Sequence, residues 1–286
     1  MNMFIKTKLY FSKRVFFSFI LFVFVNKLFA QNIDLITITD SLNNCFTKII
    51  SEKNDENKLI LNNRVLEYMR FFLSKEESFK YPVNSVKNIG FIQSGDDKLK
   101  IYTWNIPLND GTHKYFGFIQ YYSKKKKQNL VFELMDKSDE IKNPEFAVLN
   151  NTNWYGALYY RVIQTKYKNK IYYTLLASDL NNFLTKKKII DVLYFDQNEI
   201  PVFGEQIFEQ SNKFFTRVIF EFNVRASMTL TYDLNVKMIV YDHLSPSKSF
   251  LKGQYEFYGP DFSYDGLKFK KGKWIEYSDI EIKGDI

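Results

Sequence analysis

Cysteine and histidine are scarce in this chain. Its 286 residues include one cysteine, Cys45, and two histidines, His113 and His243. A single cysteine excludes an internal disulfide, and so few ligands exclude a zinc site built from cysteine and histidine. The sequence also has no glycine-rich phosphate loop, so its motifs indicate no cofactor and no metal. A hydrophobic core must therefore hold the fold together, and 45% hydrophobic residues are enough for one.

Beyond residue 30 the chain has no large excess of positive charge. The formal net charge is +8, but residues 1–30 hold five basic residues and no acidic residue. Of the 40 basic residues, 35 remain against 32 acidic ones, which leaves +3. Such a balance predicts that nucleic acid is not a partner, because phosphate-binding surfaces need clustered positive charge. The lysine runs 124–127 and 186–188 lie between predicted strands and are expected to be solvated turns.

Long apolar runs are missing beyond the first 30 residues. The run from Val15 to Val25 is interrupted only by Ser18, follows a basic segment and is followed by Ala30. This pattern is typical of a secretory signal peptide cleaved after Ala30, and the run is shorter than the roughly 20 residues of a membrane-spanning helix. We expect residues 1–30 to be removed and the mature chain to have no transmembrane helix. The predicted location is the periplasm or the extracellular space.

Helical spacing of apolar residues follows the predicted signal peptide. It covers residues 35–51 and 58–73, which a polar break at 51–55 separates. The first apolar face contains Leu35, Ile38, Leu42, Cys45 and Ile49, and the second contains Leu61, Val65, Leu66, Tyr68, Met69, Phe72 and Leu73. Cys45 is therefore expected to be a buried thiol. Because so short a helical segment is rarely stable alone, residues 31–80 are expected to pack on a β-rich domain formed by residues 81–286.

Short β-type runs separated by turn residues follow residue 81. The predicted strands are 89–94, 99–106, 113–122, 129–135, 154–165, 170–178, 188–196, 214–224, 226–232, 236–243 and 267–277. Most links are too short for a crossover helix, which favours antiparallel neighbours. The predicted fold is mainly β: an antiparallel meander sheet or sandwich preceded by two α-helices, α+β overall. Apolar and polar residues alternate in the run 214–224, so Arg217 is expected on a face that mostly meets water.

Aromatic and polar residues gather in the second half of the chain. The segment 255–266 combines five aromatic rings with three carboxylates, a composition compatible with a sugar cleft, and its Gly-Pro and Asp-Gly pairs indicate turns whose aspartates bond their own backbone. The candidate binding residues are Trp154, Tyr155, Asp242, His243, Tyr258, Asp261 and Asp265. They predict a non-enzymatic binding or envelope-associated module whose partner is an envelope protein or a glycan.

A secreted hydrolase acting on glycan or peptide is the alternative. Residues 241–246 end a predicted strand and bring an aspartate, a histidine and a serine close together in sequence. Adjacent residues on a strand point to opposite faces, so Asp242 and His243 cannot simply form a catalytic pair. The sequence therefore assigns no catalytic residue. A cleft that gathers these two side chains with Glu256 and Asp261 would favour an enzyme, and their dispersal would favour a binding module.

Part of the second half resembles a known family. The segments that carry the likeness are Asn153–Tyr160, Ile190–Asp196, Pro201–Gly204, Ala226–Met228, Asp242–Pro246 and Gly259–Phe262. Over roughly residues 150–280, the chain resembles a family of uncharacterised exported proteins of Bacteroidota. The resemblance implies an envelope or secreted location in a Gram-negative cell. It implies no activity and no site residue.

Overall fold

The computed structural model describes residues 35–81 and 86–281. The predicted signal peptide lies outside these residues. Unit 1 of the described chain contains residues 35–51, 60–81 and 86–87, and unit 2 contains residues 52–59 and 88–281. Among the described helices, none is long and apolar enough to cross a membrane.

Unit 1 is helical, and both predicted helices are present. They are residues 35–51 and α2 (Asp55–Ser74), and a short 3-10 helix, η1 (Glu76–Phe79), follows. The Asn54 side chain caps α2 by accepting a hydrogen bond from the Asn57 N–H at 2.9 Å. The predicted apolar faces are buried at Leu35, Ile38, Leu42, Cys45, Ile49, Val65, Met69, Phe72 and Leu73, whereas Tyr68 is exposed. Burial raises the pKa of the Cys45 thiol, so Cys45 is a neutral apolar side chain as predicted.

The first turn of α2 belongs to unit 2, where it meets the loop between two strands. A carboxylate oxygen of Asp55 accepts a hydrogen bond from the Asn109 backbone N–H at 2.9 Å. The Lys58 ammonium group donates to the carbonyl of Pro107 at 3.0 Å. Two charge-assisted bonds therefore fix this turn to the loop. For the remainder of residues 31–80, packing on the sheet stays a prediction.

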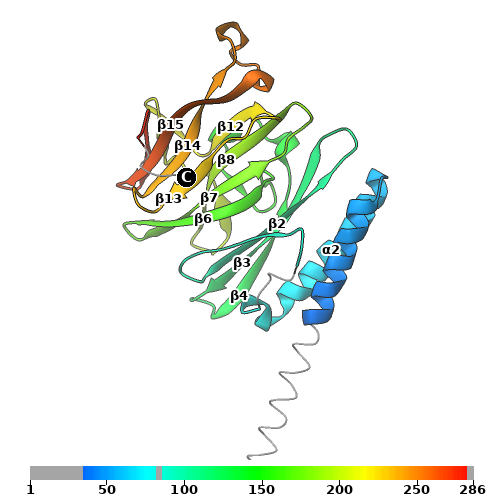
Figure 1. Ribbon diagram of the computed structural model, residues 1–286. Coiled ribbons are helices and arrows are strands. Elements are labelled where there is room, and N and C mark those ends of the chain that lie inside the picture. The colour runs from blue at the N-terminus through cyan, green and yellow to red at the C-terminus, as the bar shows by residue number, and fades with distance from the viewer. Residues whose placement is uncertain (1–34, 82–85, 282–286) are drawn as a thin grey trace, which may run out of the picture. The chain divides into compact units, whose positions relative to one another are not determined.

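Unit 2 contains three mostly antiparallel sheets (Figure 1). The first sheet is a meander in the order β1-β2-β3-β4, as predicted. Its strands are β1 (Gly90–Gln93), β2 (Leu99–Pro107), β3 (His113–Ser123) and β4 (Gln128–Met135). Tight turns join these strands, and Asp97 and Lys127 take the left-handed conformation that such turns require, each with φ of 55°.

The second sheet, named the middle sheet below, has the order β5-β9-β8-β7-β6, with β12 also paired to β8. Its strands are β5 (Leu149–Asn150), β6 (Leu158–Tyr167), β7 (Lys170–Asp179), β8 (Thr185–Phe195), β9 (Pro201–Phe203) and β12 (Val218–Asn223). The third sheet has the order β11-β10-β16-β15-β14-β13, in which β10 and β16 are parallel. Its strands are β10 (Phe208–Gln210), β11 (Lys213–Phe215), β13 (Leu230–Asp233), β14 (Met238–Pro246), β15 (Tyr258–Lys270) and β16 (Lys273–Tyr277).

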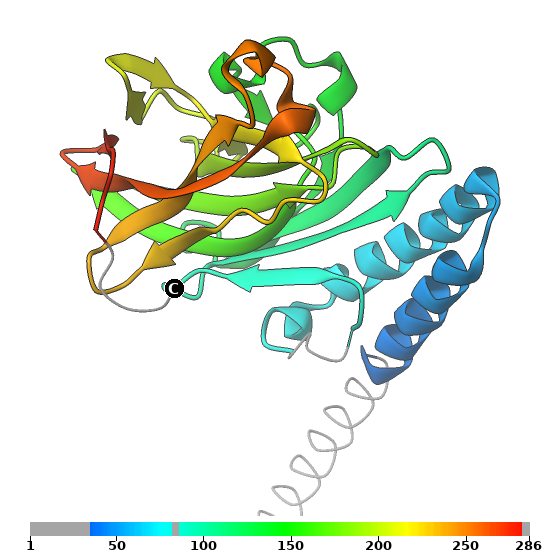
Figure 2. The same ribbon diagram turned by 45° about the horizontal axis from the view of Figure 1, so that its top comes forward.

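Two hydrophobic cores cover the two faces of the middle sheet, which lies between the other two sheets (Figure 2). In β7, Tyr173, Leu175 and Ala177 face the core shared with the first sheet. Tyr172 and Leu176 face the core shared with the third sheet. Because both faces are covered, β7 has a nearly continuous apolar run instead of the alternation of a half-exposed strand. The predicted sandwich is confirmed, with the middle sheet packed between two others.

The segment 255–266 is not the loop that its turn-forming pairs predict. Residues Tyr255–Phe257 form the 3-10 helix η6, and β15 then continues through both the Gly-Pro and the Asp-Gly pair. In the register with β14, Leu244 faces Pro260 and Tyr241 faces Asp265. Cross-strand pairing along β14 thus outweighs the local turn preference.

One of the two lysine runs is not a turn. Residues 186–188 lie within β8, between β7 and β12, whereas residues 124–127 form the turn that was predicted. In β8 the Lys187 ammonium group lies 3.5 Å from the carboxylate of Asp179. This counter-charge explains how a lysine can occupy a half-buried strand.

Arg217 is buried, although the strand alternation predicts that it faces water. Its Nε lies 2.9 Å from Oδ2 of Asp191, and its Nη1 donates to the carbonyl of Pro144 at 2.6 Å. The Arg217 side chain is fully buried and that of Asp191 is 2% exposed. The segment around Pro144, in the 3-10 helix η4 (Pro144–Phe146), thus covers the face that was expected to meet water.

Candidate functional site

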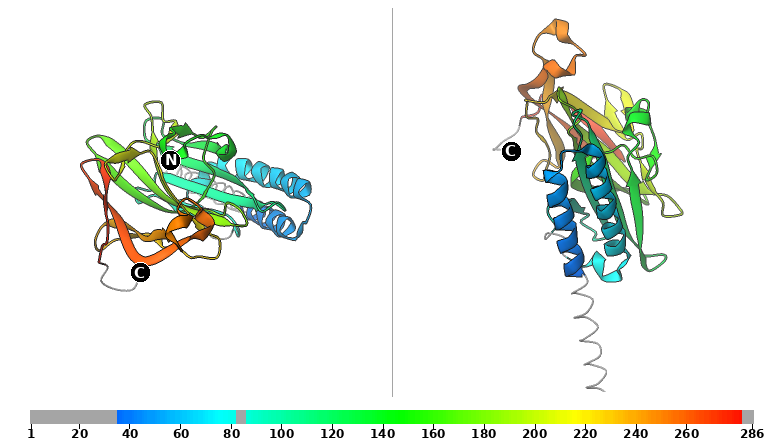
Figure 3. Two further views of the ribbon diagram at one scale, coloured as in Figure 1. Left: turned by 90° about the horizontal axis from the view of Figure 1, so that it is seen from above. Right: turned by 90° about the vertical axis from the view of Figure 1, so that its right-hand side faces the viewer.

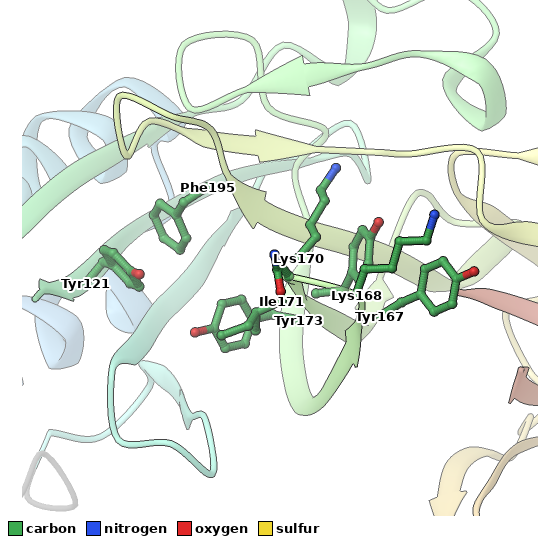
Figure 4. Close-up of a pocket in the computed structure, with 9 residues that line it drawn as sticks. Tyr121, Tyr167, Lys168, Lys170, Ile171, Tyr173 and Phe195 are labelled. Carbon is green, nitrogen blue, oxygen red and sulfur yellow. The ribbon is translucent and has the colours of Figure 1, made fainter. Parts of the chain in front are cut away.

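A pocket opens beside the turn between β6 and β7 (Figure 4). Its volume is about 590 Å³, which is within the range of small-ligand sites. The lining residues are Tyr121, Tyr167, Lys168, Asn169, Lys170, Ile171, Tyr172, Tyr173 and Phe195. Five aromatic rings and two lysines thus line one pocket, and no carboxylate lines it.

Three segments that are distant in sequence form the lining. Strand β3 contributes Tyr121, the β6–β7 hairpin contributes residues 167–173, and the end of β8 contributes Phe195. Tyr173 belongs to the core on one face of the middle sheet and Tyr172 to the core on the other. The pocket therefore lies where both cores reach the hairpin, and Tyr167, at 38% exposure, is its most exposed ring.

One side of the pocket is an aromatic wall, on which Tyr121 and Phe195 lie together (Figure 4). Their rings stack with centroids 3.8 Å apart, and Tyr173 meets Phe195 edge-on at 6.4 Å. The Tyr173 hydroxyl donates to Oδ2 of Asp96 at 3.1 Å. Burial, with the Asp96 carboxylate nearby, raises the pKa of Tyr173, so its hydroxyl remains a donor. These contacts hold the wall rigid before any ligand binds.

Lys170 and Tyr172 form the floor of the pocket on the other face of β7. The Lys170 ammonium group forms an ion pair with Glu205 and lies 3.5 Å from the centroid of the Tyr194 ring. The Tyr172 hydroxyl donates to the same carboxylate at 3.2 Å. Burial and the negative charge of Glu205 raise the pKa of Tyr172 to about 12. Lys170 is therefore neutralised and held in place, and it contributes fixed donors to the pocket.

The rim of the pocket is formed by Tyr167 and Lys168. A side chain at Gly272 would place its Cβ 2.5 Å from Cδ1 of Tyr167, so the ring lies against the β15–β16 turn. Tyr167 remains 38% exposed, and the Lys168 ammonium group lies 5.5 Å from the centroid of its ring. Among the described residues, no carboxylate lies within ion-pair distance of Lys168. Of the two lysines that line the pocket, Lys168 is thus the one without a counter-charge in the described part of the chain.

Two of the predicted binding residues are buried instead of lining a surface. Trp154 is fully buried, and its indole N–H donates to the Tyr159 hydroxyl at 2.8 Å. Tyr155 is 6% exposed; its hydroxyl lies 3.4 Å from the Lys187 ammonium group, and the Arg217 guanidinium lies 5.6 Å from its ring centroid. Each of the two residues thus has partners within the fold, and contact of either one with a ligand stays a prediction.

The predicted His243, Asp261 and Asp265 do lie together. Nδ1 of His243 donates to Oδ2 of Asp265 at 2.7 Å, and Nε2 lies 4.0 Å from Oδ2 of Asp261. The hydrogen bond to Asp265 raises the pKa of His243, which partial burial opposes. Partial burial favours a higher pKa for Asp261, but hydrogen bonds from Ser263 outweigh it and lower this pKa. The cluster therefore favours a protonated imidazole between two carboxylates.

The other predicted residues are dispersed. Asp242 accepts the Thr229 backbone N–H at 2.6 Å on the opposite face of β14. The Tyr258 hydroxyl accepts the Gly253 N–H at 2.9 Å. Within the described chain no serine, threonine or cysteine bonds to His243. His243 with Asp261 and Asp265 thus forms an ion-pair cluster, and Asp242 lies apart from it.

Replacing His243 with asparagine is expected to destabilise the protein more in mild acid than in base. The raised pKa means that folding favours the protonated imidazole, so its contribution is complete below the unfolded value of about 6.5 and is lost as the pH rises through the folded value. The side chain is 48% exposed, so the effect stays within about 1 kcal/mol. Thermal unfolding of both proteins at about pH 6 and about pH 9 measures the difference.

His113 provides the matched control for that measurement. Its Nδ1 lies 2.8 Å from the Asn105 amide nitrogen, and burial lowers its pKa, which the nearby Asp179 opposes. Folding therefore favours the neutral ring, and the loss in the His113→Asn variant is expected to be larger in base than in acid. Equal losses at both pH values for His243→Asn would contradict the ion-pair assignment.

The chain was compared with known protein families, curated proteins and solved structures, and it matches none of them. The resemblance to exported proteins of Bacteroidota therefore stays a prediction. What the pocket can bind is therefore argued from the residues that line it.

The sequence patterns singled out none of the pocket residues. A signal was present, because the run Tyr167-Lys168-Asn169-Lys170 places a ring and two cations at a hairpin turn. That run alone is indistinguishable from a solvated turn. Its neighbours Tyr121 and Phe195 become recognisable only when the sheets are packed.

Proposed function

We propose that this protein is an exported, non-enzymatic binding protein of the cell envelope that holds an acidic saccharide in the pocket beside the β6–β7 turn. The observation that carries the proposal is the lining itself, which has five aromatic rings, two lysines and no carboxylate. Aromatic faces suit the apolar C–H side of a sugar ring, and the ammonium group of Lys168 suits a carboxylate or sulfate. The pocket volume of about 590 Å³ suits one or two sugar units.

Free positive charge favours an acidic sugar over a neutral one. Lys168 has no carboxylate partner among the described residues, so an acidic group on the ligand can pair with it. The turn at residues 124–127 begins three residues after Tyr121 and adds four exposed lysines. The acidic neighbours are already committed to bonds within the protein, since Glu205 pairs with Lys170 and Glu199 accepts the Ser123 hydroxyl at 2.7 Å. A longer acidic glycan can therefore extend from the pocket along this turn.

Binding is favoured over hydrolysis by what the pocket contains. Its lining has no histidine, carboxylate, serine or cysteine, and these are the usual acid, base and nucleophile of hydrolases. His243 is not part of this lining. The predicted signal in residues 1–30 and the family resemblance support the proposed location outside the inner membrane. A protein at that location meets acidic polysaccharides of the envelope and the surroundings.

Binding to polygalacturonate, with methyl-esterified polygalacturonate as the neutral comparison, tests the proposal. We expect the exported protein to bind the acidic polymer and to release it as salt is added. The Lys168→Gln variant should bind about tenfold more weakly, because a charge-assisted hydrogen bond is lost. Tyr167→Ala should cause a similar loss of about tenfold through the removed ring face. Isothermal titration calorimetry measures each affinity.

Two variants serve as controls. Lys166→Gln removes an equal charge from an exposed position of β6 that does not line the pocket, and Tyr68→Ala removes an exposed ring from α2. Both should bind like the wild type. Equal affinity for the acidic and the esterified polymer would contradict the role of Lys168. Wild-type affinity in both pocket variants, or capture of an envelope protein that survives them, would place the binding surface elsewhere.

A further inference from the structure

A long arm projects from the third sheet (Figures 1 and 3). It comprises residues 244–262: the end of β14, the 3-10 helices η5 (Ser249–Leu251) and η6, and the start of β15. In the arm, Ser247 donates its backbone N–H to the carbonyl of Phe257 at 2.9 Å, so the strands remain paired up to the tip. A bulge at His243, where the β14–β15 register shifts, marks the base of the arm.

The arm exposes large apolar side chains. Phe250 at the tip is 74% exposed and Phe262 near the base is 96% exposed, while Tyr255 and Phe257 are each more than 40% exposed. Phe262 also has a φ of 72°, a left-handed conformation that is costly for an aromatic residue. So many exposed rings on one short segment are typical of an interaction surface.

The tip of the arm is basic as well as apolar. Residues 247–255, at the tip, contain Lys248 and Lys252 and no acidic residue, and the two acidic residues of the arm, Glu256 and Asp261, follow on its returning side. The Lys248 ammonium group lies 5.8 Å from the centroid of the Phe250 ring. A phenylalanine flanked by lysines is the arrangement of interfacial membrane anchors, in which the ring enters the acyl boundary and the ammonium groups meet lipid phosphates.

We propose that the tip of the arm inserts Phe250 into the headgroup region of an anionic lipid bilayer. Charge complementarity favours a lipid surface over a second copy of the chain. If two tips met in a symmetric dimer, Lys248 and Lys252 of one copy would face the same lysines of the other, and like charges would repel. An anionic surface attracts these lysines instead. This inference is independent of the saccharide pocket, which lies beside the β6–β7 turn.

The variant Phe250→Trp reports insertion directly. The native tryptophans Trp104, Trp154 and Trp274 are each at most 1% exposed, so their emission is insensitive to lipid. We expect the emission of the new tryptophan to move to shorter wavelength with vesicles of phosphatidylcholine and phosphatidylglycerol, and to be quenched when the lipids carry brominated chains. The matched control is Leu234→Trp, because Leu234 is 70% exposed in the β13–β14 turn at the opposite end of β14. Its emission should not change.

Two further measurements separate the contribution of the Phe250 ring to vesicle binding from that of the two lysines. In a Phe250→Ser variant, partition onto the same vesicles should fall about tenfold, because one buried ring contributes this much. Lys248→Gln with Lys252→Gln should abolish the preference over vesicles of phosphatidylcholine alone. All variants carry the same N-terminus, so any effect of residues 1–30 is constant. Quenching equal to that of Leu234→Trp would overturn the proposal. So would a blue shift of Phe250→Trp that depends on protein concentration without lipid, which would indicate self-association.

Discussion

Replacing Asp191 with leucine is expected to lower the free energy of unfolding by about 3–5 kcal/mol, because the change leaves a buried guanidinium without its counter-charge. Arg217 is fully buried, its Nε lies 2.9 Å from the Asp191 carboxylate, and Pro144 supplies one carbonyl acceptor. Desolvation raises the pKa of Asp191, an effect that Arg217 opposes. Urea unfolding followed by circular dichroism measures the loss.

A double variant shows whether the loss comes from the uncompensated charge. Asp191→Leu combined with Arg217→Met replaces the pair by apolar side chains and should recover most of the stability. The exposed pair Lys114–Asp139, at 3.1 Å, supplies the control, since Asp139→Asn should cost less than about 1 kcal/mol. If Asp191→Leu alone were as stable as the wild type, the pair would not be buried as described.

Truncating Trp154 to alanine should cost about 3–5 kcal/mol, comparable with the loss of the buried ion pair. The indole is fully buried in the core between the first and middle sheets, and its N–H donates to Tyr159 at 2.8 Å. The backbone of Trp154 also bonds to Met135 and Lys137 beside the end of β4. The variant therefore loses packing on both sheets. Chemical denaturation measures the change.

The Trp154→Phe variant is expected to lose less stability than Trp154→Ala, because it retains a ring and removes only the hydrogen-bond donor to Tyr159. Phe183, 69% exposed, is the surface comparison, and Phe183→Ala should change stability by no more than about 0.5 kcal/mol. Saccharide binding by the folded Trp154→Phe variant should match the wild type. Loss of binding with unchanged stability would return Trp154 to the binding surface.

The fold could be predicted because its signals are local. Helical spacing marks residues 35–51 and α2, and short apolar runs between turn residues mark most strands of the three sheets. The errors occur where packing overrides local preference. The Gly-Pro and Asp-Gly pairs lie within β15 because β14 pairs with it, and Arg217 is buried because η4 covers it.

The candidate site could not be predicted in the same way. Tyr121, the hairpin residues 167–173 and Phe195 come from three segments, and only the packed sheets bring them to one pocket. His243, Asp261 and Asp265 were each candidates from the sequence, but the bond from His243 to Asp265 crosses from β14 to β15 and depends on the register. Trp154 is buried in the core, and an aromatic residue in a core and one in a binding loop look alike in sequence.

Hydrogen exchange of the exported protein, with and without an oligogalacturonide, tests the binding site most directly. Amides of residues 167–173 and of the turn at 124–127 should exchange more slowly when the saccharide is bound. Amides around His243 and of residues 261–265 should not change. Protection confined to that second region, or no protection in either, would contradict the assignment of the pocket beside the β6–β7 turn as the saccharide site.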